Sequence, residues 1–239
     1  MSGHSKWSTI KHKKAVTDAA RGRLFSRLVK AIAIAVKTGG GADPDANPKL
    51  RVAMEAAKAA NMPKVNIDRV ITKASSEGEN FEEVTYEGFG PGGFGVIVEA
   101  ATDNRNRTGQ EIKSIFEKRG GQLAGPGAVS YNFEPKGYLS IKRNENLDEQ
   151  MLALIDLGVE DMEESEDGID AYVSSSELFE VKNKVEAAGF NVNSAELIQK
   201  PKTFHKLEGE RGAKAIEFLE ALDELDDVQK VFENLDVNT

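Results

Sequence analysis

The first forty residues of the chain read MSGHSKWSTIKHKKAVTDAARGRLFSRLVKAIAIAVKTGG, and they separate a basic beginning from an acidic remainder. They contain nine Lys and Arg residues against one acid, Asp18, whereas the whole chain of 239 residues has a formal net charge of −9. A strongly basic segment on an acidic protein indicates a polyanionic partner such as nucleic acid. Phosphate groups would supply the negative charge that these cations lack locally.

The basic arm, defined here as residues 1–14, carries one aromatic side chain among its cations. Trp7 is the only tryptophan of the protein, and a flat ring between lysines suits stacking on an unpaired base. The ring equally suits folding back onto the first helix, and both interpretations stay open. The candidate nucleic-acid contacts of the arm are His4, Lys6, Trp7, Lys11, His12, Lys13 and Lys14.

Residues 18–37 have the periodicity of one amphipathic helix. One face carries the apolar row Leu24, Leu28, Ile32 and Val36. The opposite face carries a basic stripe, which adds four candidate phosphate contacts: Arg23, Arg27, Lys30 and Lys37. Alternatively, these long cations only solvate the outer face of the helix. Ile34 falls on the basic side, so the two faces are not fully separated.

Two further helices complete an all-α domain over residues 1–75. Asn47 and Pro48 have the order of an N-cap followed by proline at the first helical position, so a second helix is expected over residues 48–60. A third helix follows Pro63 and runs to about residue 74. This domain has fifteen cations against five acids, so we expect the charge asymmetry to be a property of whole domains.

Beyond residue 80 the periodicity changes from helical to strand-like. Two strands, residues 84–87 and 95–102, flank a glycine-rich loop. The loop formally matches G-x-G-x-x-G, but a strand follows it, and a dinucleotide site needs a helix N-terminus there. A helix over residues 109–119, with Thr108 and Glu111 at capping-box spacing, and a strand near residues 129–133 are expected next.

Residues 138–199 have the order β-α-β-β-α-β, which predicts a ferredoxin-like sheet with two helices on one face. Asn146 is the expected cap of the first helix, and residues 174–177 have capping-box spacing before the second. A last helix, residues 209–222, and a strand, residues 228–232, would complete a sandwich begun by residues 84–133.

The predicted fold class is therefore α+β, with a three-helix domain followed by two ferredoxin-like α/β sandwich domains, one inserted in the other. The expected boundaries are residues 1–75 for the basic helical domain, 76–134 plus 204–239 for the discontinuous domain, and 135–203 for the inserted domain. Such an insertion is tolerated where the termini of the insert lie close together.

A polar turn at residues 103–107, with the sequence DNRNR, provides a secondary candidate site in the acidic part of the chain. Its candidates are Asn104, Arg105 and Arg107, because such side chains at a helix start can hold a phosphate or a loop backbone. In the structural alternative, Asp103 and Asn104 bind local amides and the arginines pair with nearby carboxylates.

Residues for catalysis are scarce. The absence of cysteine excludes disulfides, thiol catalysis and thiolate metal sites. His4, His12 and His205 lie at no familiar metal-binding spacing, and the carboxylates of residues 160–167 surround a predicted hairpin turn without a sheltered cleft. We expect no catalytic residue, metal, cofactor or small-molecule substrate. The chain lacks a secretory signal and a membrane-spanning run, which predicts a cytoplasmic protein without a membrane partner.

Several stretches of the sequence resemble signatures of one family. GHSKW at residues 3–7, followed by IKHKK at 10–14, is similar to the opening of the YebC family. Further similar stretches are GGGADPDANP at 39–48, YEGFGPGG at 86–93, DNRNRT at 103–108 and DVQ at 227–229. The resemblance implies a probable transcriptional regulator, as in bacterial members. Its mitochondrial relatives are translational activators of cytochrome oxidase mRNA.

These observations favour a non-enzymatic, nucleic-acid-binding regulator of gene expression that contacts DNA through its basic N-terminal domain. One alternative is a ribosome-associated translation factor or translational activator that binds rRNA or mRNA. It is favoured by Trp7 among lysines and by the absence of a clear helix-turn-helix recognition helix. A second alternative is a protein-interaction scaffold that binds through its acidic domains. The sequence leaves the oligomeric state open. Cations paired within the folded chain would count against a nucleic-acid surface.

Overall fold

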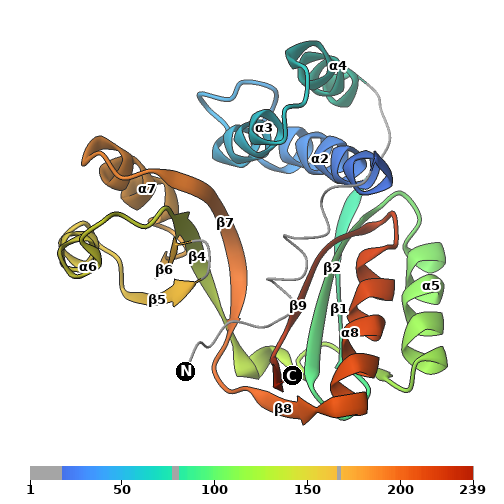
Figure 1. Cartoon of the computed structure of the whole chain (residues 1–239). Coiled ribbons are helices and arrows are strands. Elements are labelled where there is room, and N and C mark those ends of the chain that lie inside the picture. The colour runs from blue at the N-terminus through green and yellow to red at the C-terminus, as the bar shows by residue number, and fades with distance from the viewer. Residues whose placement is uncertain (1–17, 77–80, 166–167, 239) are drawn as a thin grey trace. The chain divides into compact units, whose positions relative to one another are not determined.

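The computed structural model describes residues 18–76, 81–165 and 168–238 of the chain (Figure 1). It has the predicted α+β fold, with helices first and antiparallel sheets after them. The described residues fall into two compact units. Residues 130–204 form the inserted unit, and the chain on either side of them forms the main unit.

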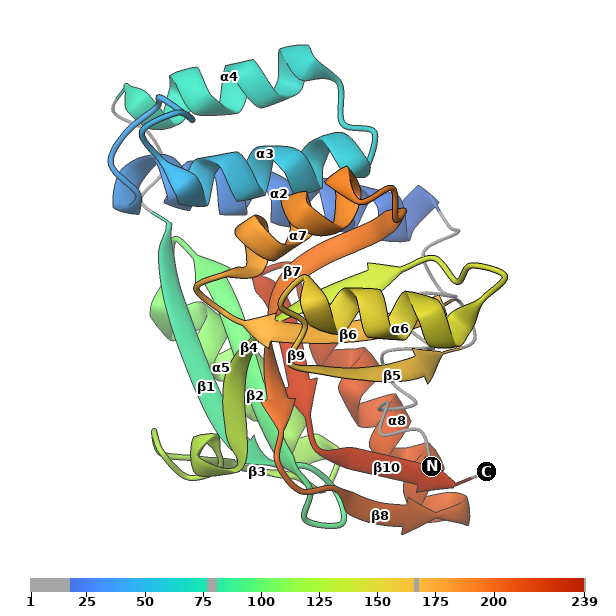
Figure 2. The same cartoon turned by 90° about the vertical axis from the view of Figure 1, so that its left-hand side faces the viewer.

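The helical domain, defined here as residues 18–76, belongs to the main unit and contains three helices that pack on one another (Figure 2). They are α2 (Asp18–Thr38), α3 (Pro48–Ala59) and α4 (Lys64–Ser75). Asn47 caps α3 as predicted, since its side-chain oxygen accepts a hydrogen bond from the Leu50 main-chain amide at 3.0 Å. The side-chain nitrogen of Asn47 also donates to the Ala35 carbonyl at 2.8 Å, so one buried side chain joins the end of α2 to the start of α3.

The sandwich domain, defined here as residues 81–129 and 205–238, completes the main unit. Its antiparallel sheet has the order β3-β1-β2-β9, and two helices cover one face of it (Figure 1). The core between sheet and helices includes Phe116 and Phe218, whose rings meet edge to face at 5.0 Å. The elements are β1 (Glu82–Phe89), β2 (Gly95–Thr102), α5 (Arg105–Lys118), β3 (Gln122–Ala124), α8 (Gly209–Asp223) and β9 (Val228–Glu233).

The connectivity of the sandwich domain differs from that of the inserted unit, because two strands in succession precede its first helix. A short parallel pair, β8 (His205–Glu208) and β10 (Leu235–Asn238), was not expected from the sequence. It places His205 in a strand that pairs with Leu235.

The inserted unit has the predicted β-α-β-β-α-β order and the antiparallel strand order β5-β6-β4-β7. Leu139 and Ile169 are fully buried in the core between its sheet and its helices. The expected cap of α6 is confirmed, because Asn146 accepts a hydrogen bond from the Glu149 amide. The elements are β4 (Phe133–Ile141), α6 (Leu147–Asp156), β5 (Asp161–Ser165), β6 (Gly168–Ser174), α7 (Leu178–Ala187) and β7 (Val192–Pro201).

Three local expectations are corrected. Helix α5 begins at Arg105, four residues early, because Asn104 rather than Thr108 is its N-cap. The strand expected at residues 129–133 is a 3-10 turn, Ser130–Asn132, before β4. The expected capping box at residues 174–177 does not form within the described chain, where the Ser174 hydroxyl lies 2.9 Å from that of Ser176 instead.

Among the described residues, no helix is both long enough and apolar enough to cross a bilayer. His, Asp and Glu side chains in the same part of the chain form no cluster of three suited to a metal ion.

Candidate nucleic-acid interface

Helix α2 is buried on two sides. Leu28, Ile32 and Val36 lie in the core of the helical domain, as the periodicity predicts. Ile34 lies on the basic side and is nevertheless only 3% exposed, and α2 contacts strand β2. The basic side of α2 therefore faces the sandwich domain near Ile34.

Arg27 contacts the end of helix α8. Its Nη1 lies 3.2 Å from Oδ1 of Asp223, and its Nη2 donates to the main-chain carbonyl of the same residue. Asp223 is the last residue of α8, where the helix dipole concentrates negative charge. The Arg27 side chain is 13% exposed, so its charge is neutralised by the carboxylate and the helix end.

Lys30 lies one turn further along α2 and contacts the loop between α8 and β9. Its ammonium group donates to Oδ1 of Asp227 at 2.6 Å and to the Asp226 carbonyl at 2.9 Å. The Nζ atom also lies 5.8 Å from the centre of the Phe81 ring, a distance typical of cation–π contacts. Arg27 and Lys30 together join the helical domain to the sandwich domain.

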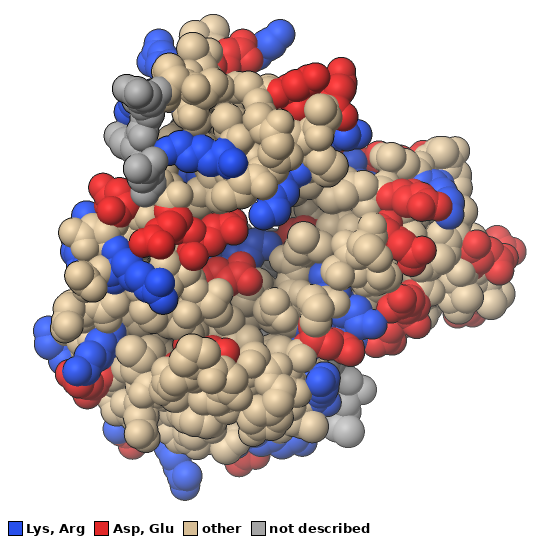
Figure 3. All heavy atoms as spheres, turned by 180° about the vertical axis from the view of Figure 1, so that it is seen from behind, with Lys and Arg blue, Asp and Glu red and all other residues tan. Residues whose placement is uncertain are grey.

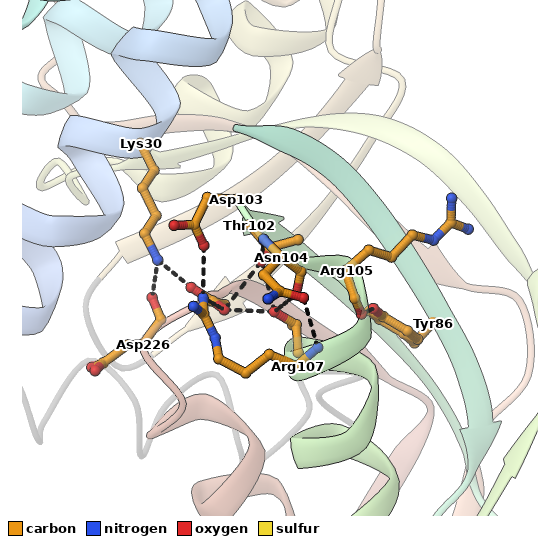
Figure 4. A network of polar contacts seen from close by, with 10 residues as sticks. Lys30, Tyr86, Thr102, Asp103, Asn104, Arg105, Arg107 and Asp226 are labelled. Carbon is orange, nitrogen blue, oxygen red and sulfur yellow. Dashed lines mark hydrogen bonds and ion pairs between the residues drawn. The ribbon is translucent and has the colours of Figure 1, made fainter. Parts of the chain in front are cut away.

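Asp227 is the centre of this polar network, and its partners Lys30 and Arg107 are labelled in Figure 4. Its carboxylate accepts hydrogen bonds from Lys30, from Arg107 at 2.7 Å and from the Thr108 hydroxyl at 2.5 Å. The Thr102 hydroxyl lies 3.3 Å away. Burial by itself would raise the pKa of Asp227, but hydrogen bonds from Arg107, Lys30 and Thr108 outweigh burial and lower the pKa to about 2. The carboxylate is therefore held as an anion.

The DNRNR turn lies beside Asp227 and is organised mainly by contacts within the chain. Asn104 caps α5 by accepting from the Arg107 amide at 3.1 Å. The Arg107 guanidinium bridges Asp227 and Asp103, and these hydrogen bonds raise its pKa. The Arg105 side chain is exposed and points away from the network (Figure 4). The structural alternative thus describes Asn104 and Arg107, and of the two arginines only Arg105 points away from the network.

The predicted contacts of the helical domain have different surroundings. Arg23 is partly exposed and Lys37 is exposed, as a surface stripe requires. Arg27 and Lys30 are instead partly buried, and in the free chain they contact acids and carbonyls of the sandwich domain where phosphates were expected. The arm candidates lie outside the described residues: His4, Lys6, Trp7, Lys11, His12, Lys13 and Lys14.

Helices α3 and α4 carry a second set of cations that the sequence reasoning did not single out. These two helices contain six Lys and Arg residues and two acids, and all six cations are exposed: Lys49, Arg51, Lys58, Lys64, Arg69 and Lys73. The count of fifteen cations against five acids in residues 1–75 included these six residues, but the sequence reasoning did not assign them to an exposed face of α3 or α4. On the side of the molecule in Figure 3, basic and acidic side chains are interspersed.

The residues missed by the sequence reasoning also include two partners of the basic stripe, Asp223 and Asp227, and the Thr108 hydroxyl that donates to Asp227. Thr108 and Asp227 belonged to stretches noted above, DNRNRT and DVQ, but neither was a candidate for the site, and Asp223 belonged to no such stretch. Their role depends on contacts between segments about 120 and 200 residues apart in the chain, which no local pattern reports.

Comparison with known proteins extends over both units. A family model described as "TACO1/YebC protein N-terminal domain" matches residues 5–77, and one described as "TACO1/YebC second and third domain" matches residues 81–235. The chain belongs to the TACO1/YebC family. The boundary between the two matches falls between α4 and β1.

Several known proteins are similar to this chain over nearly its full length. A "Probable transcriptional regulatory protein" of Trichlorobacter lovleyi is 45% identical in an alignment of 240 positions that covers 100% of this chain and 97% of that protein. A protein of Dictyoglomus thermophilum with the same name is 45% identical, over 99% and 96% of the two chains. The crystal structure of the conserved hypothetical protein Aq1575 of Aquifex aeolicus has a TM-score of 0.89 and 46% identity, and the match covers 98% of each chain.

Proposed function

We propose that this TACO1/YebC-family protein is a non-enzymatic regulator of gene expression that binds DNA through its helical domain. The names of its curated relatives support a regulatory role. The observation that carries the proposal is the exposed excess of cations on α3 and α4, six against two acids, in a chain that is acidic as a whole. The basic arm adds cations to the same domain.

The surface proposed here is suited to phosphate contacts. Lysines and arginines on two packed helices can follow a phosphate backbone, and such contacts position a protein without reading sequence. Each phosphate neutralised on duplex DNA steepens the dependence of log K on log salt by about 0.9. The proposed binding is therefore strongly salt-dependent. Arg27 and Lys30 do not belong to this surface in the free chain, because the sandwich domain occupies them.

A second candidate function is regulation of translation through rRNA or mRNA. The observation that favours it is Trp7 between lysines of the arm, because an aromatic ring among cations suits unpaired bases. Under this proposal Trp7→Ala weakens the binding of single-stranded RNA more than that of duplex DNA. Equal losses on both ligands would contradict base stacking by Trp7.

A direct test compares two sets of charge substitutions of equal size in the full chain. The first variant combines Lys49→Gln, Arg51→Gln and Lys58→Gln on α3, and the control combines Lys113→Gln, Lys118→Gln and Lys214→Gln on α5 and α8. Fluorescence anisotropy with a labelled DNA duplex and with a single-stranded RNA of equal length measures both affinities. We expect the α3 variant to lose about tenfold or more in affinity and the control less than threefold. Equal losses would contradict the proposed surface.

A further inference from the structure

The segment that occupies Arg27 and Lys30 is itself densely acidic. Residues 223–227 read DELDD, with four acids in five positions. To α2 it presents two carboxylates, of Asp223 and Asp227, and two main-chain carbonyls, of Asp223 and Asp226. Anionic oxygens at hydrogen-bond distance from an arginine and a lysine are also what a phosphate backbone offers. The segment thus occupies the same donors that a nucleic acid would use.

The contact at Arg27 leaves one donor without an acceptor. Among the described residues, the Arg27 Nε atom is buried and has no hydrogen-bond partner. The Nε2 atom of Gln229, at the start of β9, is likewise buried and without a partner in the described chain. A buried donor without an acceptor destabilises the state that contains it. A phosphodiester has two non-bridging oxygens and can take Nε and Nη of one guanidinium together, which the Asp223 carboxylate does not do here.

The two ion pairs differ in how firmly each is held. Asp227 is 6% exposed and receives hydrogen bonds from Lys30, Arg107 and Thr108, so its place is fixed by the sandwich domain. Asp223 is 20% exposed and lies at the end of a helix. The Arg27–Asp223 contact is therefore the part of this interface that a competing anion exchanges most readily.

We propose that the acidic segment Asp223–Asp227 is an internal competitor for nucleic acid. It holds Arg27 and Lys30 in the free chain, and a polyanion bound to the helical domain displaces it from Arg27. This inference rests on the proposed function and adds regulation of the same surface. Because only part of the molecules has Arg27 available, the apparent affinity of the wild-type chain is lower than the affinity of the open state.

The inference predicts that weakening the acidic contact strengthens binding. Asp223→Asn keeps the size of the side chain and removes its charge. Its matched control is Glu210→Gln, which removes an equal charge from the first turn of the same helix, where Glu210 pairs with Lys214. In the full chain, with the labelled duplex and the single-stranded RNA used above, we expect Asp223→Asn to bind about five- to tenfold more tightly than wild type. The Glu210→Gln control should change affinity less than twofold.

A second measurement follows the wild-type contact itself. The natural chain has no cysteine, so spin labels can be placed at Ala56→Cys on α3 and Gln110→Cys on α5, two exposed positions of the main unit. Pulsed electron–electron double resonance then measures the distance between the two labels, and so between the helical domain and the sandwich domain. We expect a broader distribution at longer distance when nucleic acid saturates the protein. The Asp223→Asn chain should show part of this broadening without ligand.

The outcomes separate the competition from the proposed function. If wild type binds nucleic acid but Asp223→Asn binds like Glu210→Gln, or if the label distance stays unchanged at saturation, the competition is refuted and the function stands. If only Asp223→Asn binds, the competition is supported in its strongest form. If neither chain binds at low salt, the proposed function fails and the competition fails with it.

Discussion

The cations on α2 and those on α3 belong to one helical domain but have opposite surroundings. Arg27 and Lys30 are 13% and 14% exposed and contact oxygens of the sandwich domain. Lys49, Arg51 and Lys58 are exposed to solvent. The comparison shows that the net charge of a domain does not report its available charge, because a neighbouring domain can neutralise one face and leave another open. Cations of the first set should matter for stability, and those of the second for binding.

We expect the largest change in stability when Asp227, the buried acid that contacts Lys30, is replaced. Asp227→Ala leaves Lys30, Arg107 and Thr108 without their shared acceptor, and we expect the free energy of unfolding to fall by about 3–5 kcal/mol. Urea unfolding at pH 7 measures the loss. Asp103→Ala is the control, because Asp103 also pairs with Arg107 but is half-exposed, and it should lose less than about 1 kcal/mol. Similar losses of unfolding free energy in both variants would contradict the greater importance of the buried carboxylate for stability.

A second buried acid, Glu233, lies at the other end of β9 and has the opposite pH dependence to Asp227. Glu233 is 5% exposed and accepts a hydrogen bond from the Leu235 amide, and its burial raises its pKa to about 8. Because the folded-state pKa lies above the ordinary value, the stability that Glu233 contributes is fully present below about pH 4.5 and is lost as pH rises toward 8. Asp227 has the opposite shift, and its contribution is lost only as pH falls below about 4.

Glu233→Gln removes the first of these two dependences. Between pH 5 and pH 7 the free energy of unfolding should fall about 2–3 kcal/mol more in wild type than in this variant. Urea unfolding at both pH values measures the difference. An identical pH dependence of wild type and variant would show that burial of Glu233 does not disfavour its charged form.

A smaller effect separates two arginines of the DNRNR turn. Arg107→Gln removes a donor from the buried Asp227 carboxylate, and since Arg107 is 46% exposed we expect a small loss of stability that is still larger than the loss in Arg105→Gln. Arg105→Gln changes an exposed side chain and should alter stability by less than about 0.5 kcal/mol. Thermal unfolding of both variants in one buffer compares them directly. A larger loss for Arg105→Gln would contradict the arrangement of the turn.

We expect the smallest change in stability when the exposed cations of α3 are replaced. The α3 variant with Lys49→Gln, Arg51→Gln and Lys58→Gln should unfold within about 0.5 kcal/mol of wild type, because exposed side chains contribute little. Urea unfolding checks this value, alongside the binding measurement that the same variant serves. A substantial loss of stability would mean that these cations also hold the fold.

Much of the fold could be predicted because local signals agree with the structure. Helix α2 runs from Asp18 to Thr38, within one residue of its expected end, since its apolar row and the glycines after it mark its length. The start of α5 was misplaced because Thr108 and Glu111 have capping-box spacing by coincidence. The Thr108 hydroxyl instead contacts Asp227, 119 residues away in the sequence.

The candidate site was less predictable, because it depends on which face of α2 meets another domain. The sequence did contain one signal: Ile34 lies on the basic side, within the apolar run of residues 31–36 that surrounds the helix. A helix that is apolar all round is buried on more than one side. The partner and the register of that contact come only from the tertiary fold.

Photocrosslinking of the full chain to a labelled duplex and to a single-stranded RNA, with the crosslinked residues mapped by mass spectrometry, shows which surface contacts nucleic acid. We expect crosslinks on α3 and α4 and on the basic arm, and additional crosslinks near Arg27 in the Asp223→Asn chain. Crosslinks confined to residues 130–204, or to α5 and α8, would contradict a nucleic-acid surface on the helical domain.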